Sequence, residues 1–184
     1  MRKKLKSEAG FTLVEMLVTT VVMVLLGLML NVGLQMAVRS YRAVTAQSEA
    51  ELLLSTAVDA LADDLRFARM YEAADSGDGV PFTYFSDSYG ENTHLTLDGE
   101  TGQIMAGGKR VLPTGAYGLE GADGKRAYEV TRMTIMPNLA ENTFTIALTV
   151  AATIDGGISA STPEGGVTVR CLNKMNGMET EGGS

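Results

Sequence analysis

The residue best placed to do chemistry is a single carboxylate, Glu15, inside an otherwise uncharged segment from Phe11 to Val38. An ionised carboxylate is expensive to place in hydrocarbon, so a carboxylate retained there is a candidate for a functional site. Gly10 precedes the segment, and a glycine lets a catalytic group approach the backbone closely because it has no side chain. Glu15 is therefore a candidate functional residue, and Gly10 is a position at which the backbone is unobstructed.

The element that must position these residues is the apolar segment itself, which spans 28 residues. About 20 apolar residues are enough for a helix to cross a bilayer. Four basic residues lie within the first ten positions, and Arg39 and Arg42 follow the segment. Because positive charge gathers on the cytoplasmic side of membranes, we expect a cytoplasmic N-terminus and an outside location beyond about residue 40.

Two ordinary membrane signals compete with a specialised one. A secretory signal would have an apolar region of about 7–15 residues, followed by a small-x-small cleavage site. This segment is longer, and residues 34–37 at its exit contain no such pair. A plain signal anchor would account for the length and the orientation. It would explain neither Gly10 nor the position of Glu15.

The stretch Gly10-Phe11-Thr12-Leu13-Val14-Glu15 lies between a basic leader and a membrane-length apolar run. This arrangement resembles the class III signal of type IV prepilins and pseudopilins. The resemblance implies that a membrane prepilin peptidase cuts between Gly10 and Phe11 and N-methylates Phe11. It also implies that Glu15 neutralises the N-terminal ammonium of a neighbouring subunit during assembly. Pairing the two charges recovers much of the several kcal/mol that each costs in a low dielectric.

The sequence after the apolar run predicts that the helix continues. Neither Pro nor Gly occurs from Gln35 to Asp75, and good helix formers are frequent there. Apolar residues spaced by three and four predict a face that packs on a domain. This stripe consists of Leu54, Val58, Leu61, Leu65 and Ala68. We expect Asp63 to reach Arg66 one turn later, and Asp63 and Asp64 to be solvated on different sides.

The sequence pattern and the resemblance together divide the chain into five segments. These are a leader over residues 1–10, a transmembrane or filament-core helix over 11–38, an amphipathic continuation over 39–75, an extracytoplasmic β-rich domain over 76–172 and a flexible tail over 173–184. The expected strands are Phe82 to Phe85, His94 to Leu97, Gln103 to Met105, Arg110 to Leu112, Tyr128 to Met136, Thr143 to Ile154 and Val167 to Leu172. A turn signal from Leu97 to Gly102 predicts a hairpin. Strands without intervening helices indicate a mostly antiparallel sheet covered by the helix, an α+β fold.

The overall charge argues against one class of partner. The chain carries 15 basic and 22 acidic residues, for a net charge of -7. Removal of residues 1–10 takes away four basic side chains and one acidic one, which would lower the net charge to -10. With only 6% aromatic residues as well, nucleic acid is not an expected partner.

The residue types used in enzymatic and metal sites are sparse. His94 is the only histidine, so we expect neither a multi-histidine metal site nor a catalytic triad, and place His94 at the surface or a sheet edge. Cys171 is the only cysteine; burial is favoured over pairing between chains. Asp75, Asp78 and Asp123 lie near glycines and could bind calcium, but their spacing matches no EF-hand, so turn chemistry is favoured. We expect no cofactor, no metal and no enzymatic activity.

The expected function is that of a structural subunit of a type IV pilus-like filament, or of a secretion or competence pseudopilus. The stretch Leu52 to Arg69 resembles minor pilins or pseudopilins within that group. The implied partners are prepilin peptidase/N-methyltransferase, other pilin or pseudopilin subunits, lipids of the cytoplasmic membrane and an assembly platform. The expected location is the cytoplasmic membrane, then an extracellular filament or pseudopilus. The alternative is an uncleaved, single-pass, membrane-anchored extracytoplasmic binding domain.

Overall fold

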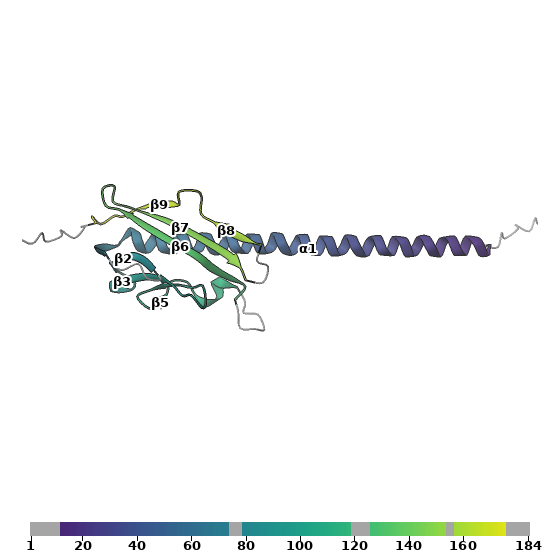
Figure 1. Ribbon diagram of the computed structural model, residues 1–184, viewed down its shortest axis with the longest axis horizontal. Helices are drawn as coiled ribbons and strands as arrows, with labels where there is room; N and C mark the ends of the chain where they lie inside the picture. Colours follow the sequence, from purple (N-terminus) through teal and green to yellow (C-terminus); the bar gives the residue numbers. More distant parts are fainter. Residues whose placement is uncertain (1–11, 74–78, 119–125, 154–156, 176–184) are drawn as a thin grey trace, which may run out of the picture. The chain divides into compact units, whose positions relative to one another are not determined.

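The computed structural model describes residues 12–73, 79–118, 126–153 and 157–175. The chain forms two units, Met1–Val44 and Thr45–Ser184. The long helix α1 (Leu13–Arg66) has residues in both units, and all strands belong to the second (Figure 1). The elements after α1 are β1 (Arg69–Ala73), β2 (Gly79–Ser86), β3 (Gly90–Leu97), β4 (Ile104–Ala106), β5 (Lys109–Arg110), the 3-10 helix η1 (Thr114–Tyr117), β6 (Tyr128–Asn138), β7 (Thr143–Ala152), β8 (Ser159–Ser161) and β9 (Val167–Arg170).

The end of α1 corrects the expected continuation over residues 39–75, because the helix stops at Arg66. The backbone N–H groups of Phe67 and Ala68 donate to carbonyls three residues earlier, which tightens the last turn. Arg69–Ala73 then forms β1 and pairs antiparallel with β2. Helix propensity is a weak preference that tertiary context overrides, and here the edge of β2 supplies hydrogen-bond partners for these residues.

The strands form two antiparallel sheets. One sheet has five strands in the order β1-β2-β3-β4-β5. In the other, β7 lies between β6 on one side and both β8 and β9 on the other (Figure 1). The turn after β3 is the predicted hairpin, since Asp98 N–H donates to Gln103 O at 2.9 Å and Gly102 N–H to Asp98 O at 2.8 Å. The predicted α+β fold with antiparallel strand pairing is confirmed, although the strands form two sheets where one was expected.

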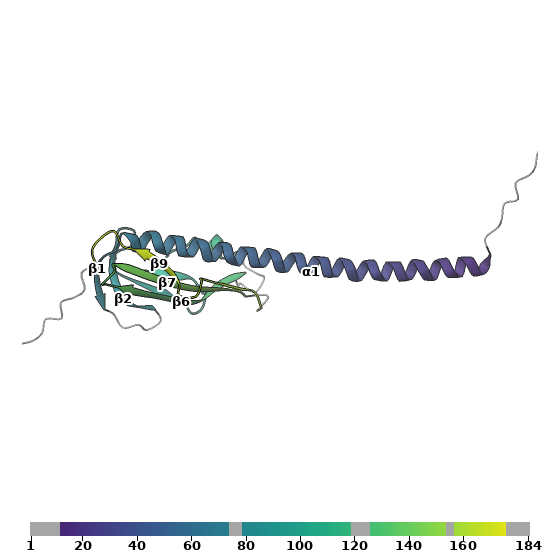
Figure 2. The same cartoon turned by 90° about the horizontal axis from the view of Figure 1, so that it is seen from above.

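The core lies between the sheets and the last part of α1, which runs along the strands of the second unit (Figure 2). Phe82 on β2 stacks on Phe144 on β7, with ring centroids 5.6 Å apart, so one aromatic pair joins the two sheets. The helix contributes the buried residues Ala50, Leu53, Ala57, Leu61, Ala62 and Leu65. Leu54 and Val58 are only half-buried and flank this face. The end of the predicted stripe is correct, because Leu61, Leu65 and Ala68 are buried. Its beginning is wrong, because Ala50, Leu53 and Ala57 are buried there in place of Leu54 and Val58.

Two smaller expectations are wrong. His94 is half-buried on β3, which lies between β2 and β4 and is no edge strand, and its Nε2 lies 2.7 Å from Val80 O. The predicted flexible tail does not begin at residue 173. Asn173 Nδ2 donates to Phe67 O at 2.7 Å, and Met175 is buried with its N–H donating to Asn142 Oδ1 at 2.8 Å. These side-chain hydrogen bonds fix the chain after β9 to the helix end and to the β6–β7 turn.

Candidate functional site

The beginning of α1 is set by Thr12. The Thr12 hydroxyl oxygen accepts a hydrogen bond from Glu15 N–H at 3.2 Å, and the Thr12 carbonyl accepts one from Met16 N–H at 3.2 Å. Thr12-x-x-Glu15 is the sequence pattern of a capping box, in which the first residue satisfies a free N–H of the first helical turn. Glu15 therefore sits in the first turn of α1, where the helix dipole favours a negative charge.

The Glu15 carboxylate is exposed, and among residues 12–73 and the other described ranges it has no ion-pair or side-chain hydrogen-bond partner. Gly10 and Phe11, the expected cleavage pair, lie outside the described residues. Of the three predicted site residues, only Glu15 is therefore described by the structure, and it lies next to Thr12. Sequence reasoning missed Thr12 as a cap, although the Thr-x-x-Glu spacing was a signal for it.

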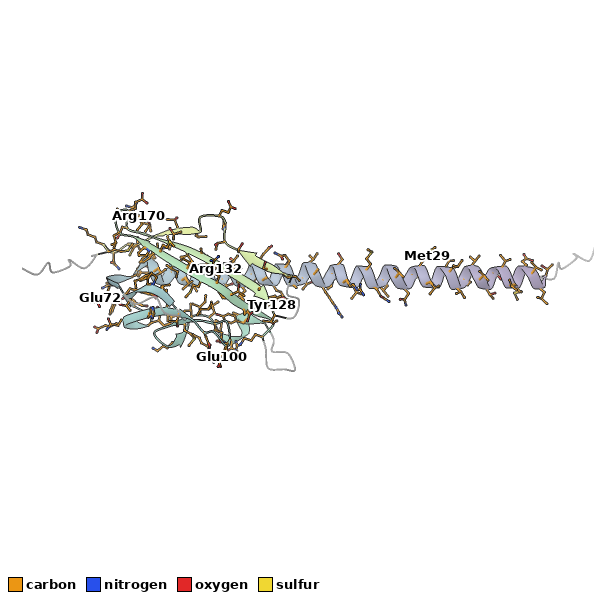
Figure 3. All side chains as sticks on the ribbon, viewed as in Figure 1. Met29, Glu72, Glu100, Tyr128, Arg132 and Arg170 are labelled. Atoms are coloured by element: carbon orange, nitrogen blue, oxygen red, sulfur yellow. The ribbon has the colours of Figure 1, made fainter. Side chains whose placement is uncertain are left out.

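The helix that follows Glu15 presents apolar side chains around its whole circumference (Figure 3). An 18-residue window within α1 has a mean hydropathy of 2.5, and none of that window is buried. Met29, labelled in Figure 3, is 70% exposed. By length and composition, this helix could cross a membrane.

Polar residues inside the apolar run satisfy one another or the backbone. The Thr19 hydroxyl donates to Met16 O at 2.9 Å, and the Thr20 hydroxyl donates to Leu17 O at 2.8 Å. Gln35 Nε2 donates to Asn31 Oδ1 at 2.6 Å. Hydrogen bonds within the helix make such residues tolerable in lipid. The carboxylate of Glu15 is different, because no side chain among the described residues pairs with it.

Comparison with known proteins bears on this end of the chain. Residues 5–31 match the prokaryotic N-terminal methylation motif. The match contains Gly10, Phe11 and Glu15, and it confirms the predicted resemblance to the type IV prepilin and pseudopilin signal. Together with the apolar helix, it supports a type IV pilin-like, membrane-anchored protein. No curated protein and no solved structure matches the chain.

A polar cluster in the second unit was not expected from the sequence. The Asp64 carboxylate accepts hydrogen bonds from the Tyr84 hydroxyl and the Ser86 hydroxyl. Ser86 Oγ in turn accepts from the N–H groups of Ser88 and Tyr89, both at 3.1 Å. Burial first, and then the nearby Asp64 charge, raise the pKa of Tyr84 well above its usual range, so its hydroxyl stays a donor. Asp64 is therefore an anchor between α1 and β2, and the expectation that it is solvated is wrong.

The remaining candidates lie apart from this cluster. Asp63 pairs with Arg66 at 3.8 Å, as expected. Cys171 is a buried free thiol whose Sγ lies 3.3 Å from Ala68 O. Asp75, Asp78 and Asp123, the calcium candidates, lie outside the described residues, and within the described ranges no group of three or more His, Cys, Asp or Glu side chains could hold a metal ion.

Proposed function

We propose that this protein is a structural subunit of a type IV pilus-like filament, or of a secretion or competence pseudopilus. A prepilin peptidase/N-methyltransferase cuts between Gly10 and Phe11 and methylates Phe11. Residues 11–38 then hold the subunit in the cytoplasmic membrane, with the N-terminus cytoplasmic and the β-rich domain outside. The observation that carries the proposal is the methylation motif over residues 5–31, which overlaps the exposed apolar first part of α1.

The exposed carboxylate supports a role for Glu15 in assembly. It lies in the first helical turn of an apolar segment and has no partner among the described residues. Cleavage after Gly10 would create an ammonium group at Phe11 of every subunit. In a low dielectric, each of these charges is costly alone and much less so as a pair. The carboxylate of one subunit thus neutralises the ammonium of the next as it enters the filament through the assembly platform.

The test compares Glu15→Ala and Glu15→Gln with Thr19→Ala, which removes a polar group one turn later without changing charge. We expect both Glu15 variants to be cleaved and methylated normally but to be absent from sheared filaments, while Thr19→Ala enters them. Normal incorporation of Glu15→Ala would contradict the pairing mechanism. If the leader is retained in cells with active peptidase, the uncleaved membrane-anchored binding domain is favoured instead.

A further inference from the structure

A hollow of about 440 Å³ opens beside α1 within the unit Thr45–Ser184. Its walls come from the helix, from the turn that contains η1 and from the beginning of β6, and they are mainly apolar. The residues that shape it are Glu49, Leu52, Leu53, Thr56, Gly118 and Tyr128. Leu52 is 67% exposed at its rim. An exposed large apolar side chain beside a hollow is typical of an interaction surface rather than of a closed core.

One edge of the hollow carries a fixed negative charge. The Tyr128 hydroxyl, at the start of β6 (Figure 3), donates to Glu49 Oε2 at 2.7 Å. Burial, and then its hydrogen bond to Glu49, raise the pKa of Tyr128 to about 12, so the hydroxyl remains a donor at neutral pH. Glu49 is exposed and forms no ion pair with any described residue. The hollow therefore offers apolar walls and one oriented carboxylate that lacks a cation.

The complementary groups lie on α1 itself. Tyr41 is 74% exposed, and the neighbouring Arg42 is exposed and has no ion pair within the described part of the chain. Tyrosine and arginine are enriched at the centres of protein interfaces, where the ring fills a pocket and the guanidinium binds a carboxylate. Because both side chains are exposed here, they are free to enter the hollow of another copy.

We propose that the hollow receives Tyr41 of a second copy of this chain, and that Arg42 of that copy pairs with Glu49. The contact rests on the proposed function, because a filament brings copies together at high local concentration. It is a heterologous contact, in which different surfaces of two identical chains meet. Such contacts generate open assemblies rather than closed dimers.

Cysteine cross-linking tests the proximity of the two residues. A chain with Tyr41→Cys and Leu52→Cys is expressed at native level and oxidised in intact filaments. Cys171 is 3% exposed and does not compete. We expect a ladder of cross-linked multimers. The matched control pairs Leu52→Cys with Leu30→Cys. Leu30 is 74% exposed and lies three turns before Tyr41 on the same side of the helix, and this pair should not cross-link.

Charge reversal tests the ion pair independently. Arg42→Glu places two like charges together, which repel each other, so we expect a more than tenfold loss of incorporation into filaments. Adding Glu49→Arg should restore incorporation. Arg170→Glu makes the same change in charge at an exposed position on β9, which does not line the hollow. That control should incorporate normally.

The outcomes separate this contact from the proposed function. Methylated subunits that form filaments without the 41–52 cross-link, or without rescue by Glu49→Arg, would overturn the docking contact alone. Cross-links only to a different protein would overturn the second copy as the occupant. A chain that retains its leader and forms no filaments would overturn the proposed function, and the docking contact with it.

Discussion

Asp64→Ala should destabilise the second unit far more than Asp63→Ala, although the two carboxylates are neighbours on α1. Asp64 accepts hydrogen bonds from the hydroxyls of Tyr84 and Ser86, which are 2% and 1% exposed. Asp63 has a side chain 77% exposed and pairs only with Arg66 at 3.8 Å. Both substitutions replace Asp by Ala and so give the same gain in helix propensity. The difference between their effects on the free energy of unfolding therefore reports the hydrogen bonds to Asp64.

The size of the effect follows from the two hydroxyls that lose their acceptor. A buried donor without a partner costs about 1–3 kcal/mol, so the loss of the acceptor for two hydroxyls should lower the free energy of unfolding by about 2–6 kcal/mol. Because Asp64 is only half-buried, water can reach part of the vacated space, and we expect a value near 3 kcal/mol. An exposed ion pair contributes about 0–1 kcal/mol, so Asp63→Ala should change stability by less than about 0.5 kcal/mol.

The assay is urea unfolding of the full-length chain in detergent micelles. The chain has six tyrosines and no tryptophan, so near-ultraviolet circular dichroism of tyrosine reports tertiary structure. If the variants share the same dependence of unfolding free energy on urea concentration, the shift in their urea midpoints gives the difference in their free energies of unfolding. Tyr84→Phe should cost less than Asp64→Ala, because the half-buried carboxylate it leaves behind can bind water. If Asp64→Ala and Asp63→Ala agree within about 0.5 kcal/mol, this account of the helix–sheet anchor is wrong.

Three further predictions concern the second unit. Gly102→Ala should destabilise the fold by about 1–3 kcal/mol more than Gly108→Ala. Both glycines have a positive φ, but only at Gly102 would a new Cβ meet Glu129 Cβ, at a distance of 2.4 Å. Equal urea midpoints for the two variants would contradict this prediction. Burial raises the pKa of the Cys171 thiol. This thiol should therefore react with a thiol reagent at least about a hundredfold more slowly in the folded protein than in denaturant. Comparable rates would show that Cys171 is accessible in the folded protein. The folded-state pKa of Tyr128, about 12, exceeds the unfolded value of about 10. Its contribution to stability is therefore complete below pH 10 and is lost as the pH rises towards 12. In Tyr128→Phe, the free energy of unfolding should fall less steeply between pH 10 and pH 12 than in the unsubstituted protein. An unchanged pH profile would argue against a raised pKa of Tyr128.

Local patterns predicted most of the fold correctly. The alternation from Phe144 to Val150 is a strand because every second side chain enters the core, and Asp98 to Gly102 turns because its residues favour a hairpin. The sequence could not show that Arg69–Ala73 leaves the helix, since its composition suits a helix and only pairing with β2 decides otherwise. The three-residue strand β8 was missed for a similar reason, because its hydrogen bonds to β7 define it.

The two candidate sites differ in what the sequence could reveal. Gly10, Phe11 and Glu15 form a contiguous motif, which the match over residues 5–31 contains. The hydrogen bonds of Asp64 to Tyr84 and of Glu49 to Tyr128 join residues 20 and 79 positions apart. No local spacing encodes such pairs, because they depend on how the helix and the sheets pack. The hollow beside α1 was invisible to sequence reasoning for the same reason.

The most direct test of the central claim is mass spectrometry of the N-terminal peptide from protein isolated from its native membrane. The account predicts a chain that begins with N-methylated Phe11 and lacks residues 1–10. A peptide that retains Met1 to Gly10, in cells whose prepilin peptidase is active, would contradict processing and assembly as a pilin-like subunit.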